Sequence, residues 1–513
     1  MLFNSYTFIV FFLPLAYAGL FISQRWNDGK YSIVWLVACS LFFYGWWNFS
    51  FVALILFSIA FNYYLGGLIQ ENFSKLYLKI GILGNLLLIS YFKYFNFFIE
   101  NLNTFVQLEA TFEVVVLPLA ISFFTFQQIA YLIDIYRKKT SKYKFSHYCL
   151  FVTFFPQLLA GPIVHHKEMI PQFRDNLIGN LTLQNLIIGI SIFSIGLFKK
   201  VIIADNVESY ATPLFMASEN GEVITFVEAW LGVLSYSFQI YFDFSGYCDM
   251  AIGIARMFGV FLPLNFDSPY KSNNIIDFWR KWHITLSRFL KEYLYFSLGG
   301  NRKGKLRKYL NLLITMLLGG LWHGAGWTFI SWGFLHGIYL IINHFWRNIR
   351  LMFISTNNKI SYFGVFGSRL LTMLSIVFAW VLFRSDSFSG ALNIYKGLFG
   401  YNGISFPEHY YYRLGSISEY LLEMGISFSG LKYFYGTQQI FVILSLIIMV
   451  SFMPNTQEIF SRYRPALGYI GDNKGPFFFT LERPRLWAFI SALVFMLSVL
   501  SINQVNEFIY FQF

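Results

Sequence analysis

A histidine set among glycines in an apolar stretch is the strongest candidate for chemistry in this chain. Residues 317–327 read LLGGLWHGAGW, with His323 near the centre and Trp322 directly before it. Histidine titrates close to neutral pH, so its side chain can serve as a general base. Four glycines within eight residues favour an interrupted helix and a close approach of backbone. A lone histidine is usually a hydrogen-bonded core residue, but these glycines and the flanking tryptophans favour a catalytic role for His323.

A second polar stretch, residues 277–291, combines aromatic, basic and histidine side chains in the sequence DFWRKWHITLSRFLK. Asp277 is well placed to cap a helix, on which Trp279, His283 and Ser287 would share one face. The stretch suits a basic, aromatic pocket for an anionic ligand, with His283 binding the ligand or moving a proton. The alternative is an interfacial amphipathic helix anchored by tryptophan. The candidates for lining a substrate site or tunnel are, in this stretch, Trp279, Arg280, Trp282, Ser287 and Arg288, and, near His323, Trp322 and His336.

A third polar stretch, QIYFDFSGYCD at 239–249, follows a long apolar run. Gln239 and Asp243 are its candidate site residues. A carboxylate within a membrane is costly unless it is paired, so Asp243 requires a cationic or hydrogen-bonding partner. Pairing with Arg280 or Arg288 and contact with a substrate are both compatible with this pattern.

The other histidines near these stretches are assigned structural roles. On one continuous helix, His336 would lie about 20 Å from His323 and on the opposite face. We therefore expect His336 to be a buried hydrogen-bonding residue rather than a second catalyst. His165 and His166 are adjacent rather than at a metal-ligand spacing, and Lys167 follows them, so we interpret the pair as interfacial. Metalloprotease, nucleotide-binding and GxSxG motifs are absent, and we expect no metal.

Composition identifies the kind of protein that must position these residues. Of 513 residues, 56% are apolar and 12% are charged, whereas soluble domains have about 45–50% and about 25%. This excludes a disordered protein, a coiled coil and an ordinary cytosolic enzyme. The net charge of +12 lies in short loops between apolar runs, which indicates membrane topology rather than nucleic-acid binding. The sequence therefore predicts an all-α polytopic membrane protein.

A membrane span requires about 20 apolar residues, and eleven stretches fit this requirement. They are 5–23, 33–48, 51–70, 78–98, 115–135, 183–203, 223–244, 327–345, 364–384, 438–454 and 485–503. Shorter or interrupted apolar stretches lie at 147–164, 247–263, 284–298 and 309–321. Irregular backbone at membrane depth is tolerated only inside protein or along a wet cavity. The interrupted stretches are therefore where we expect the site.

Loop charges alternate in sign along the chain. Segments 100–113 and 205–222 carry only acidic charges, while 137–144 and 302–308 carry only basic charges. The positive-inside rule places the basic segments in the cytoplasm, and counting from them places both termini outside. Segment 385–436 is then an external connecting loop, although its aromatic cluster would also suit a cap over a pore mouth.

Several of these stretches resemble the membrane-bound O-acyltransferase family, and within it the bacterial branch that O-acetylates alginate and peptidoglycan. The stretches are LPLAISFFTFQQIAYLIDIYR (117–137), FFPQLLAGPIVHH (154–166), LFKKVIIADN (197–206), QIYFDFSGYCDMAIGIARMFG (239–259), FWRKWHITLSRFLKEYLYFSLGGNRKG (278–304), LLGGLWHGAGWTFISWGFLHG (317–337), FRSDSF (383–388) and MPNTQEIF (453–460). The resemblance covers nearly the whole chain. It implies one membrane domain, 1–513, with its motifs at about 115–345 and two extra spans within 438–503.

The resemblance also implies a fold and an activity. The fold would be a ring of about 11–13 transmembrane helices, with re-entrant and interfacial helices, around a central tunnel. His323 matches the essential histidine of the family, and His283 its second conserved polar position. The activity would be transfer of acetyl groups, from acetyl-CoA as a cytoplasmic donor, across the inner membrane to an extracytoplasmic polysaccharide. A periplasmic SGNH-type acetyltransferase would be the partner, and the basic loops would face an anionic membrane surface.

Two other functions remain open from the sequence. The teichoic acid D-alanyltransferases share both histidine motifs, so D-alanyl transfer is one alternative. Helices interrupted at mid-membrane are also a feature of transporters, so transport without acyl chemistry is the other. The chain departs from the resemblance where typical members have arginine after PIV, because it has His165 there.

Overall fold

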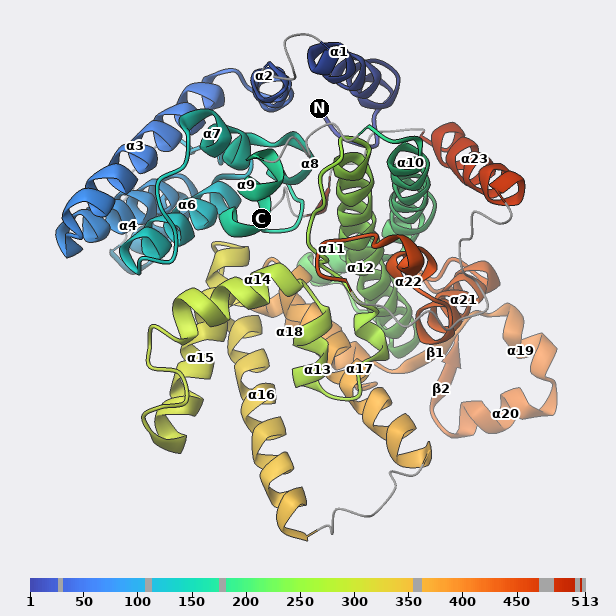
Figure 1. The fold of residues 1–513 in the computed structure, drawn as a ribbon. Coiled ribbons are helices and arrows are strands. Elements are labelled where there is room, and N and C mark those ends of the chain that lie inside the picture. The colour runs from blue at the N-terminus through green and yellow to red at the C-terminus, as the bar shows by residue number, and fades with distance from the viewer. Residues whose placement is uncertain are drawn as a thin grey trace. The chain divides into compact units, whose positions relative to one another are not determined.

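The computed structural model describes residues 1–25, 31–106, 113–174, 181–353, 362–469, 484–502 and 508–509 (Figure 1). Most of these residues are helical, and the two strands among them have three residues each. The prediction of an all-α polytopic membrane protein is confirmed. The chain divides into two compact units, one formed by 1–201, 244–265 and 456–513 and the other by 202–243 and 266–455. The single domain, the helix ring and the central tunnel stay predictions.

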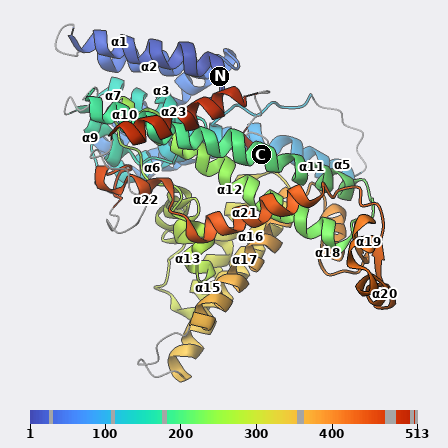
Figure 2. The same ribbon diagram turned by 90° about the vertical axis from the view of Figure 1, so that its right-hand side faces the viewer.

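The first unit contains the N-terminal helices and the last helix of the chain. Its elements are η1 (Thr7–Phe12), α1 (Leu13–Arg25), α2 (Ser32–Gly45), α3 (Ser50–Asn72), α4 (Lys75–Ile89), η3 (Ser90–Tyr94), α5 (Phe95–Val106), α6 (Ile121–Tyr136), α7 (Phe145–Thr153), α8 (Phe155–Leu158), α9 (His166–Arg174), α10 (Leu183–Phe198), the first half of η4 (Lys199–Ala204), α22 (Thr456–Ile459), η7 (Ser461–Tyr463) and α23 (Pro484–Leu500). Helices α3, α4 and α6 pack on one another, and α23 lies against α10 (Figure 2).

The second unit holds both histidine motifs. Its elements are α11 (Asp205–Glu219), the first part of α12 (Phe226–Met257), η5 (Pro269–Lys271), α13 (Ile275–Lys281), α14 (Ile284–Phe289), η6 (Leu290–Tyr295), α15 (Gly304–His323), α16 (Trp327–Phe353), α17 (Tyr362–Arg384), α18 (Phe388–Leu398), β1 (Ile404–Phe406), α19 (His409–Leu414), α20 (Ser416–Glu423), β2 (Ile426–Phe428) and α21 (Thr437–Phe452). Strands β1 and β2 pair in parallel.

Five helical segments in the described part of the chain are long and apolar enough to cross a membrane. They are Thr7–Arg25, Ser50–Asn72, Lys75–Val106, Leu183–Glu219 and Tyr362–Arg384, and each contains or overlaps a predicted span. The predicted spans at 33–48, 438–454 and 485–503 correspond to the shorter apolar helices Ser32–Gly45, Thr437–Phe452 and Arg485–Leu500; residue 503 lies outside the described residues. The remaining three predicted spans correspond to α6, α12 and α16, which do not meet the same criterion.

Of the four stretches predicted as shorter or interrupted, one lies inside a continuous helix and one starts in a helix and extends past its end. Stretch 247–263 begins inside α12, which runs for 32 residues, and 309–321 lies inside α15. The other two are irregular, one through a break between helices and one through a π-helical turn. Stretch 147–164 divides into α7 and α8 around Phe154, and 284–298 consists of α14 and the π-helical turn η6.

Segment 385–436 is a folded region rather than a plain connection, since it contains α18 to α20 and the small sheet. Its start is held by Glu219 at the end of α11. One carboxylate oxygen of Glu219 accepts hydrogen bonds from the backbone N–H groups of Asp386 (2.9 Å) and Ser387 (3.2 Å). The Ser387 hydroxyl in turn caps α18 by accepting from the Gly390 N–H at 3.0 Å. These bonds give the FRSDSF motif a structural role.

A buried polar network gives the MPNTQEIF motif a similar role in the first unit. The carboxylate of Asp249 accepts hydrogen bonds from the Lys199 ammonium at 2.6 Å, the Thr456 hydroxyl at 2.6 Å and the Gln457 amide at 2.7 Å. All of the polar partners of this buried carboxylate come from other helical elements. The network therefore joins η4, α12 and α22, as buried charge requires.

Candidate active site

His323 is the last residue of α15, at the tip of a helical hairpin. Gly324 follows it with an extended backbone, and α16 starts at Trp327 and returns alongside α15 (Figure 1). The imidazole is buried, with 4% of the residue exposed. The glycine-rich stretch thus ends a helix directly after the histidine. The interruption predicted from the four glycines lies at 324–326, whereas Gly319 and Gly320 are inside α15.

Gly320 on α15 and Gly333 on α16 allow the two helices of the hairpin to pack closely. A Cβ added to Gly320 would lie 2.2 Å from the carbonyl oxygen of Phe329 on α16. On the other side, a Cβ added to Gly333 would lie 2.3 Å from the carbonyl oxygen of Met316 on α15. Both separations are far below van der Waals contact. The backbones of α15 and α16 therefore approach each other in a way that only glycine permits, which fixes the position of His323.

His283 occupies a break between two short helices, not the middle of one helix. Helix α13 ends at Lys281, Trp282 is extended, and His283 has a left-handed backbone with φ of 43°. The helix cap is Asn274, whose side chain accepts from the Asp277 N–H at 3.0 Å. The predicted cap at Asp277 and the shared face of Trp279, His283 and Ser287 are therefore wrong. The carbonyl oxygen of His283 accepts the first hydrogen bond of α14, from the Ser287 N–H at 3.0 Å. The chain therefore turns at His283.

The break brings the two histidine motifs together. The ring centroids of His283 and His323 lie 6.3 Å apart, and His283 is fully buried. Trp322 contacts both rings, at 6.1 Å from His283 and 4.9 Å from His323. Two imidazoles at this separation, in one buried site, can act on the two ends of a single reacting group. The structure thus joins the residues to which the sequence assigned chemistry.

Aromatic side chains form the wall of this site. Trp332 of α16 and Phe383 of α17 lie 5.1 Å and 5.3 Å from the His323 ring. Trp282, fully buried like His283, packs on Trp380 at 4.9 Å. Trp332, Trp380 and Phe383 are not among the site residues predicted from the sequence. Periodicity on α16 offered a signal, because Trp332 lies four residues before His336 and shares its face.

His336 lies in the same aromatic wall, on α16, and not on one continuous helix with His323. Because α15 and α16 are separate helices, the estimate of 20 Å from His323 does not apply. Both histidines contact the ring of Trp332, His336 at 4.8 Å and His323 at 5.1 Å. The Trp279 indole N–H donates to His336 Nδ1 at 3.3 Å. This bond is the one expected of a buried hydrogen-bonding histidine.

The remaining candidates of this stretch differ in their surroundings. Arg280 is exposed on α13, whereas Arg288 and Ser287 on α14 are partly buried. The Ser287 hydroxyl lies 3.5 Å from the Trp282 carbonyl oxygen. Arg280 forms no ion pair with Asp243 in the described part of the chain. The predicted pairing of these two residues is therefore not observed.

Gln239 and Asp243 are both buried on α12, one helical turn apart. Tyr241 lies between them in sequence, and its ring is 6.3 Å from that of Trp282. This contact places the turn of α12 that carries both residues against the aromatic wall. Their assignment as substrate-contacting residues stays a prediction.

The interfacial interpretation of His165 and His166 is wrong, because His166 is fully buried. Oδ2 of Asp134, on α6, lies 3.1 Å from Lys167 Nζ, 3.2 Å from His165 Nε2 and 3.3 Å from His166 Nε2. His166 Nδ1 is also bonded to the Tyr143 hydroxyl at 3.0 Å. Asp134 and the two histidines could provide metal ligands. Since the Lys167 ammonium already neutralises the same carboxylate oxygen, we interpret the cluster as a structural ion pair.

Comparison with known proteins identifies relatives of this chain. The model of the membrane-bound O-acyltransferase family (MBOAT) matches residues 46–383. The peptidoglycan O-acetyltransferase of Helicobacter pylori is 47% identical over 435 residues, 79% of this chain and 81% of the relative. The probable alginate O-acetylase AlgI of Azotobacter vinelandii is 36% identical over 450 residues, 85% and 86% of the two chains. The teichoic acid D-alanyltransferase of Streptococcus thermophilus is 28% identical over 236 residues, 44% and 57% of the two chains.

Proposed function

Because this chain belongs to the membrane-bound O-acyltransferase family, we propose that it moves acetyl groups from acetyl-CoA in the cytoplasm to hydroxyl groups of an extracytoplasmic polysaccharide. The observation that carries this proposal is the meeting of His283 and His323 in one buried, aromatic-lined site. Family membership supports an acyl transfer reaction at that site. The multi-pass membrane character of the chain supports its location in the bacterial inner membrane.

Acyl transfer to a hydroxyl group requires a general base beside the attacking oxygen. His323 would accept the proton as the hydroxyl oxygen attacks the thioester carbonyl carbon, and the coenzyme A thiolate would then leave with that proton. General base catalysis of this kind contributes roughly 10²–10⁴-fold to a rate. His283, on the other side of Trp322, would hold the carbonyl oxygen or the leaving group. The surrounding aromatic wall would exclude water, which otherwise competes with the acceptor for the acyl group.

Peptidoglycan is the acceptor we propose. The relative from Helicobacter pylori is named a peptidoglycan O-acetyltransferase, and it is 47% identical to this chain along most of both lengths. The alginate O-acetylases share 36% over a similar length, which makes alginate or another exopolysaccharide the next candidate. The D-alanyltransferase relatives cover less than half of this chain, so D-alanyl transfer to a teichoic acid is less well supported.

Exposed basic residues support binding of an anionic donor at the cytoplasmic side. Residues 302–307 are all exposed at the start of α15, whose last residue is His323. The helix thus carries positive charge at one end and the candidate base at the other. An SGNH-type acetyltransferase in the periplasm is the partner we propose for completing transfer to the glycan.

Analysis of the cell wall tests this function. We expect deletion of the gene to remove base-labile O-acetyl groups from muramic acid residues, and the wild-type gene to restore them. Mass spectrometry of digested peptidoglycan gives this measurement. An unchanged O-acetyl content in the deletion strain would contradict the choice of acceptor, and the same digestion of exopolysaccharide would show whether alginate-type polymers lose acetyl groups instead.

Substitution of His283 by asparagine separates its chemical role from its backbone role. Asparagine tolerates the left-handed conformation that His283 adopts, so H283N is expected to keep the break between α13 and α14 while removing the imidazole. Acetylation should fall at least tenfold, with membrane levels of the protein unchanged. In contrast, H283V should also reduce the amount of folded protein, because a β-branched residue is strained at φ of 43°. Equal acetylation in H283N and wild type would exclude a chemical role for this imidazole.

A further inference from the structure

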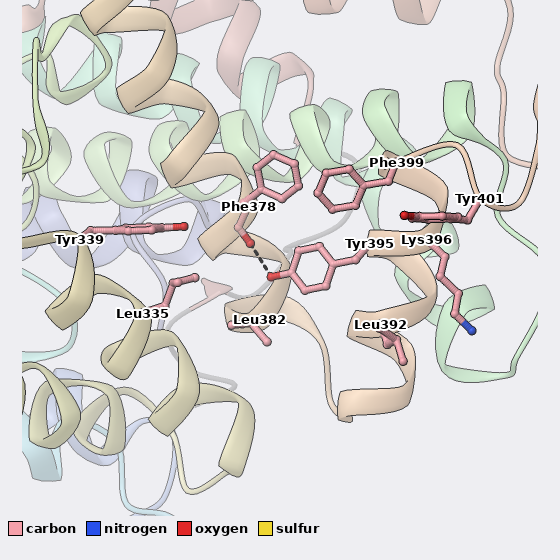
Figure 3. Close-up of a pocket in the computed structure, with 9 residues that line it drawn as sticks. All are labelled: Leu335, Tyr339, Phe378, Leu382, Leu392, Tyr395, Lys396, Phe399 and Tyr401. Carbon is pink, nitrogen blue, oxygen red and sulfur yellow. Dashed lines mark hydrogen bonds between the residues drawn. The ribbon is translucent and has the colours of Figure 1, made fainter. Parts of the chain in front are cut away.

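A groove lies on the second unit, between α16, α17 and α18. Its volume is about 500 Å³, within the range of about 300–1,000 Å³ typical of ligand sites. Leu335 and Tyr339 line it from α16, Phe378 and Leu382 from α17, and Tyr395 from α18. The Tyr395 hydroxyl donates to the Phe378 carbonyl oxygen at 2.8 Å and joins two of the walls (Figure 3). We call this feature the α16–α18 groove.

The groove is apolar and open at its α18 side. Leu392 and Phe399, which line that side, have 55% and 65% of their surface exposed. The rings of Phe378, Phe399 and Tyr395 lie close to one another (Figure 3), with centroids 5.4 Å apart for Phe378–Phe399 and 6.0 Å apart for Phe378–Tyr395. Aromatic and leucine side chains exposed in this way require an apolar neighbour, and in a membrane protein the lipid acyl chain is the apolar molecule at hand.

One cation lies at the edge of the groove. The side chain of Lys396 extends away from the rings (Figure 3) and is exposed. No carboxylate pairs with its ammonium group in the described part of the chain. An exposed cation beside an apolar groove matches a ligand that carries an anionic head on an apolar chain.

The position of the groove along α17 agrees with such a ligand. Helix α17 is one of the candidate membrane spans and ends at Arg384, so Phe378 and Leu382 belong to its last two turns. Tyr395 packs beside these turns, since its hydroxyl donates to the Phe378 carbonyl oxygen, and tyrosine is enriched where hydrocarbon meets the headgroups. The groove thus combines the last turns of a candidate span with tyrosine side chains, as expected of a site near the headgroups.

We propose that the α16–α18 groove binds one anionic phospholipid, with an acyl chain along the aromatic floor and the phosphate beside Lys396. The groove shares its walls with the site of the two histidines. On α16, Leu335 and Tyr339 face the groove while His336 faces the site. On α17, Leu382 faces the groove while Trp380 faces the site. A bound lipid would thus support the helices that hold the site. The proposal does not depend on the reaction performed there.

Lipid competition with the full-length protein tests this binding site. Detergent-solubilised, delipidated protein is mixed with phosphatidylglycerol or phosphatidylcholine of identical chains, and bound lipid is counted by native mass spectrometry. Wild type is expected to prefer phosphatidylglycerol about fivefold, the effect of one lysine near an anionic headgroup. K396Q should lose this preference and keep binding the neutral lipid. L392W should weaken binding of both lipids, because the larger ring fills the groove.

The exposed Lys75, at the start of α4, provides the matched control, and K75Q should keep the wild-type preference. Each variant is compared with wild type in one mixture, after its helical content has been checked by circular dichroism. Two results would overturn the proposal. One is equal binding of the two lipids by wild type. The other is an unchanged preference in K396Q together with wild-type binding of both lipids by L392W.

Discussion

Substitution of His323 by alanine is expected to reduce acetylation of the cell-wall polysaccharide by at least about 100-fold, the lower range for loss of a general base. The imidazole ends α15 inside an aromatic wall and lies 6.3 Å from His283, where it can take the proton of an attacking hydroxyl. The measurement is O-acetyl release from purified glycan, normalised to the amount of protein in the membrane fraction.

Two companion variants make this result specific. H323Q keeps most of the side-chain volume and a hydrogen-bonding group but cannot titrate, so its activity should be as low as that of H323A. H409A removes a histidine that is exposed on α19 and should leave acetylation within twofold of wild type. Normal acetylation in H323Q would show that His323 positions other groups and does not transfer a proton.

Substitution of Gly320 by alanine is expected to destabilise the protein and, with it, the site. The added methyl group would lie 2.2 Å from the Phe329 carbonyl oxygen, and a backbone atom cannot move aside as a flexible side chain can. Helices α15 and α16 must separate to relieve this clash, at a cost of about 1–3 kcal/mol or more. The measurement is the melting temperature of the detergent-solubilised protein, which we expect to fall by several degrees together with acetylation.

Gly367 offers the matched control for this prediction. It lies inside α17, and a Cβ added there would meet nothing within 4 Å. G367A should therefore keep or slightly raise the melting temperature, because alanine favours helix over glycine by about 1 kcal/mol. Similar melting temperatures for G320A and wild type would mean that the close backbone contact between α15 and α16 does not hold the hairpin.

The class of protein and its key histidines could be predicted from the sequence for definite physical reasons. Long apolar runs with few charges can only be buried in a membrane, and α17 matches its predicted span 364–384 to within a few residues. His323 was recognisable because a histidine among glycines in an apolar run is costly without a purpose. Glycines at 324 and 326 correctly indicated the end of a helix.

The meeting of His283 and His323 was not accessible in the same way. The two residues are forty positions apart in sequence, and periodicity describes only residues within one helix. The period of the 277–291 stretch predicted a continuous helix, whereas the left-handed backbone of His283 divides it. Local pattern gave no sign of this turn, because histidine rarely adopts positive φ without support from its surroundings.

The structural part played by polar residues outside the site also depends on distant contacts. Asp134 required a partner in apolar surroundings, but three cationic or neutral groups from the start of α9 supply it from more than thirty positions away. Likewise, Asp249 and Lys199 lie in separate motifs, and only the fold joins them to Thr456 and Gln457. Such pairs follow from tertiary packing, which spacing within a motif does not encode.

The most direct test of acetyl transfer through His323 follows a labelled acetyl group across the membrane. Sealed inverted membrane vesicles, whose cytoplasmic face is outside, are given acetyl-CoA with a labelled acetyl group while peptidoglycan fragments and the periplasmic proteins are enclosed within. We predict base-labile label on the enclosed glycan for wild type and H409A, and none above background for H323A. Equal labelling of the glycan in H323A and wild type would contradict the account.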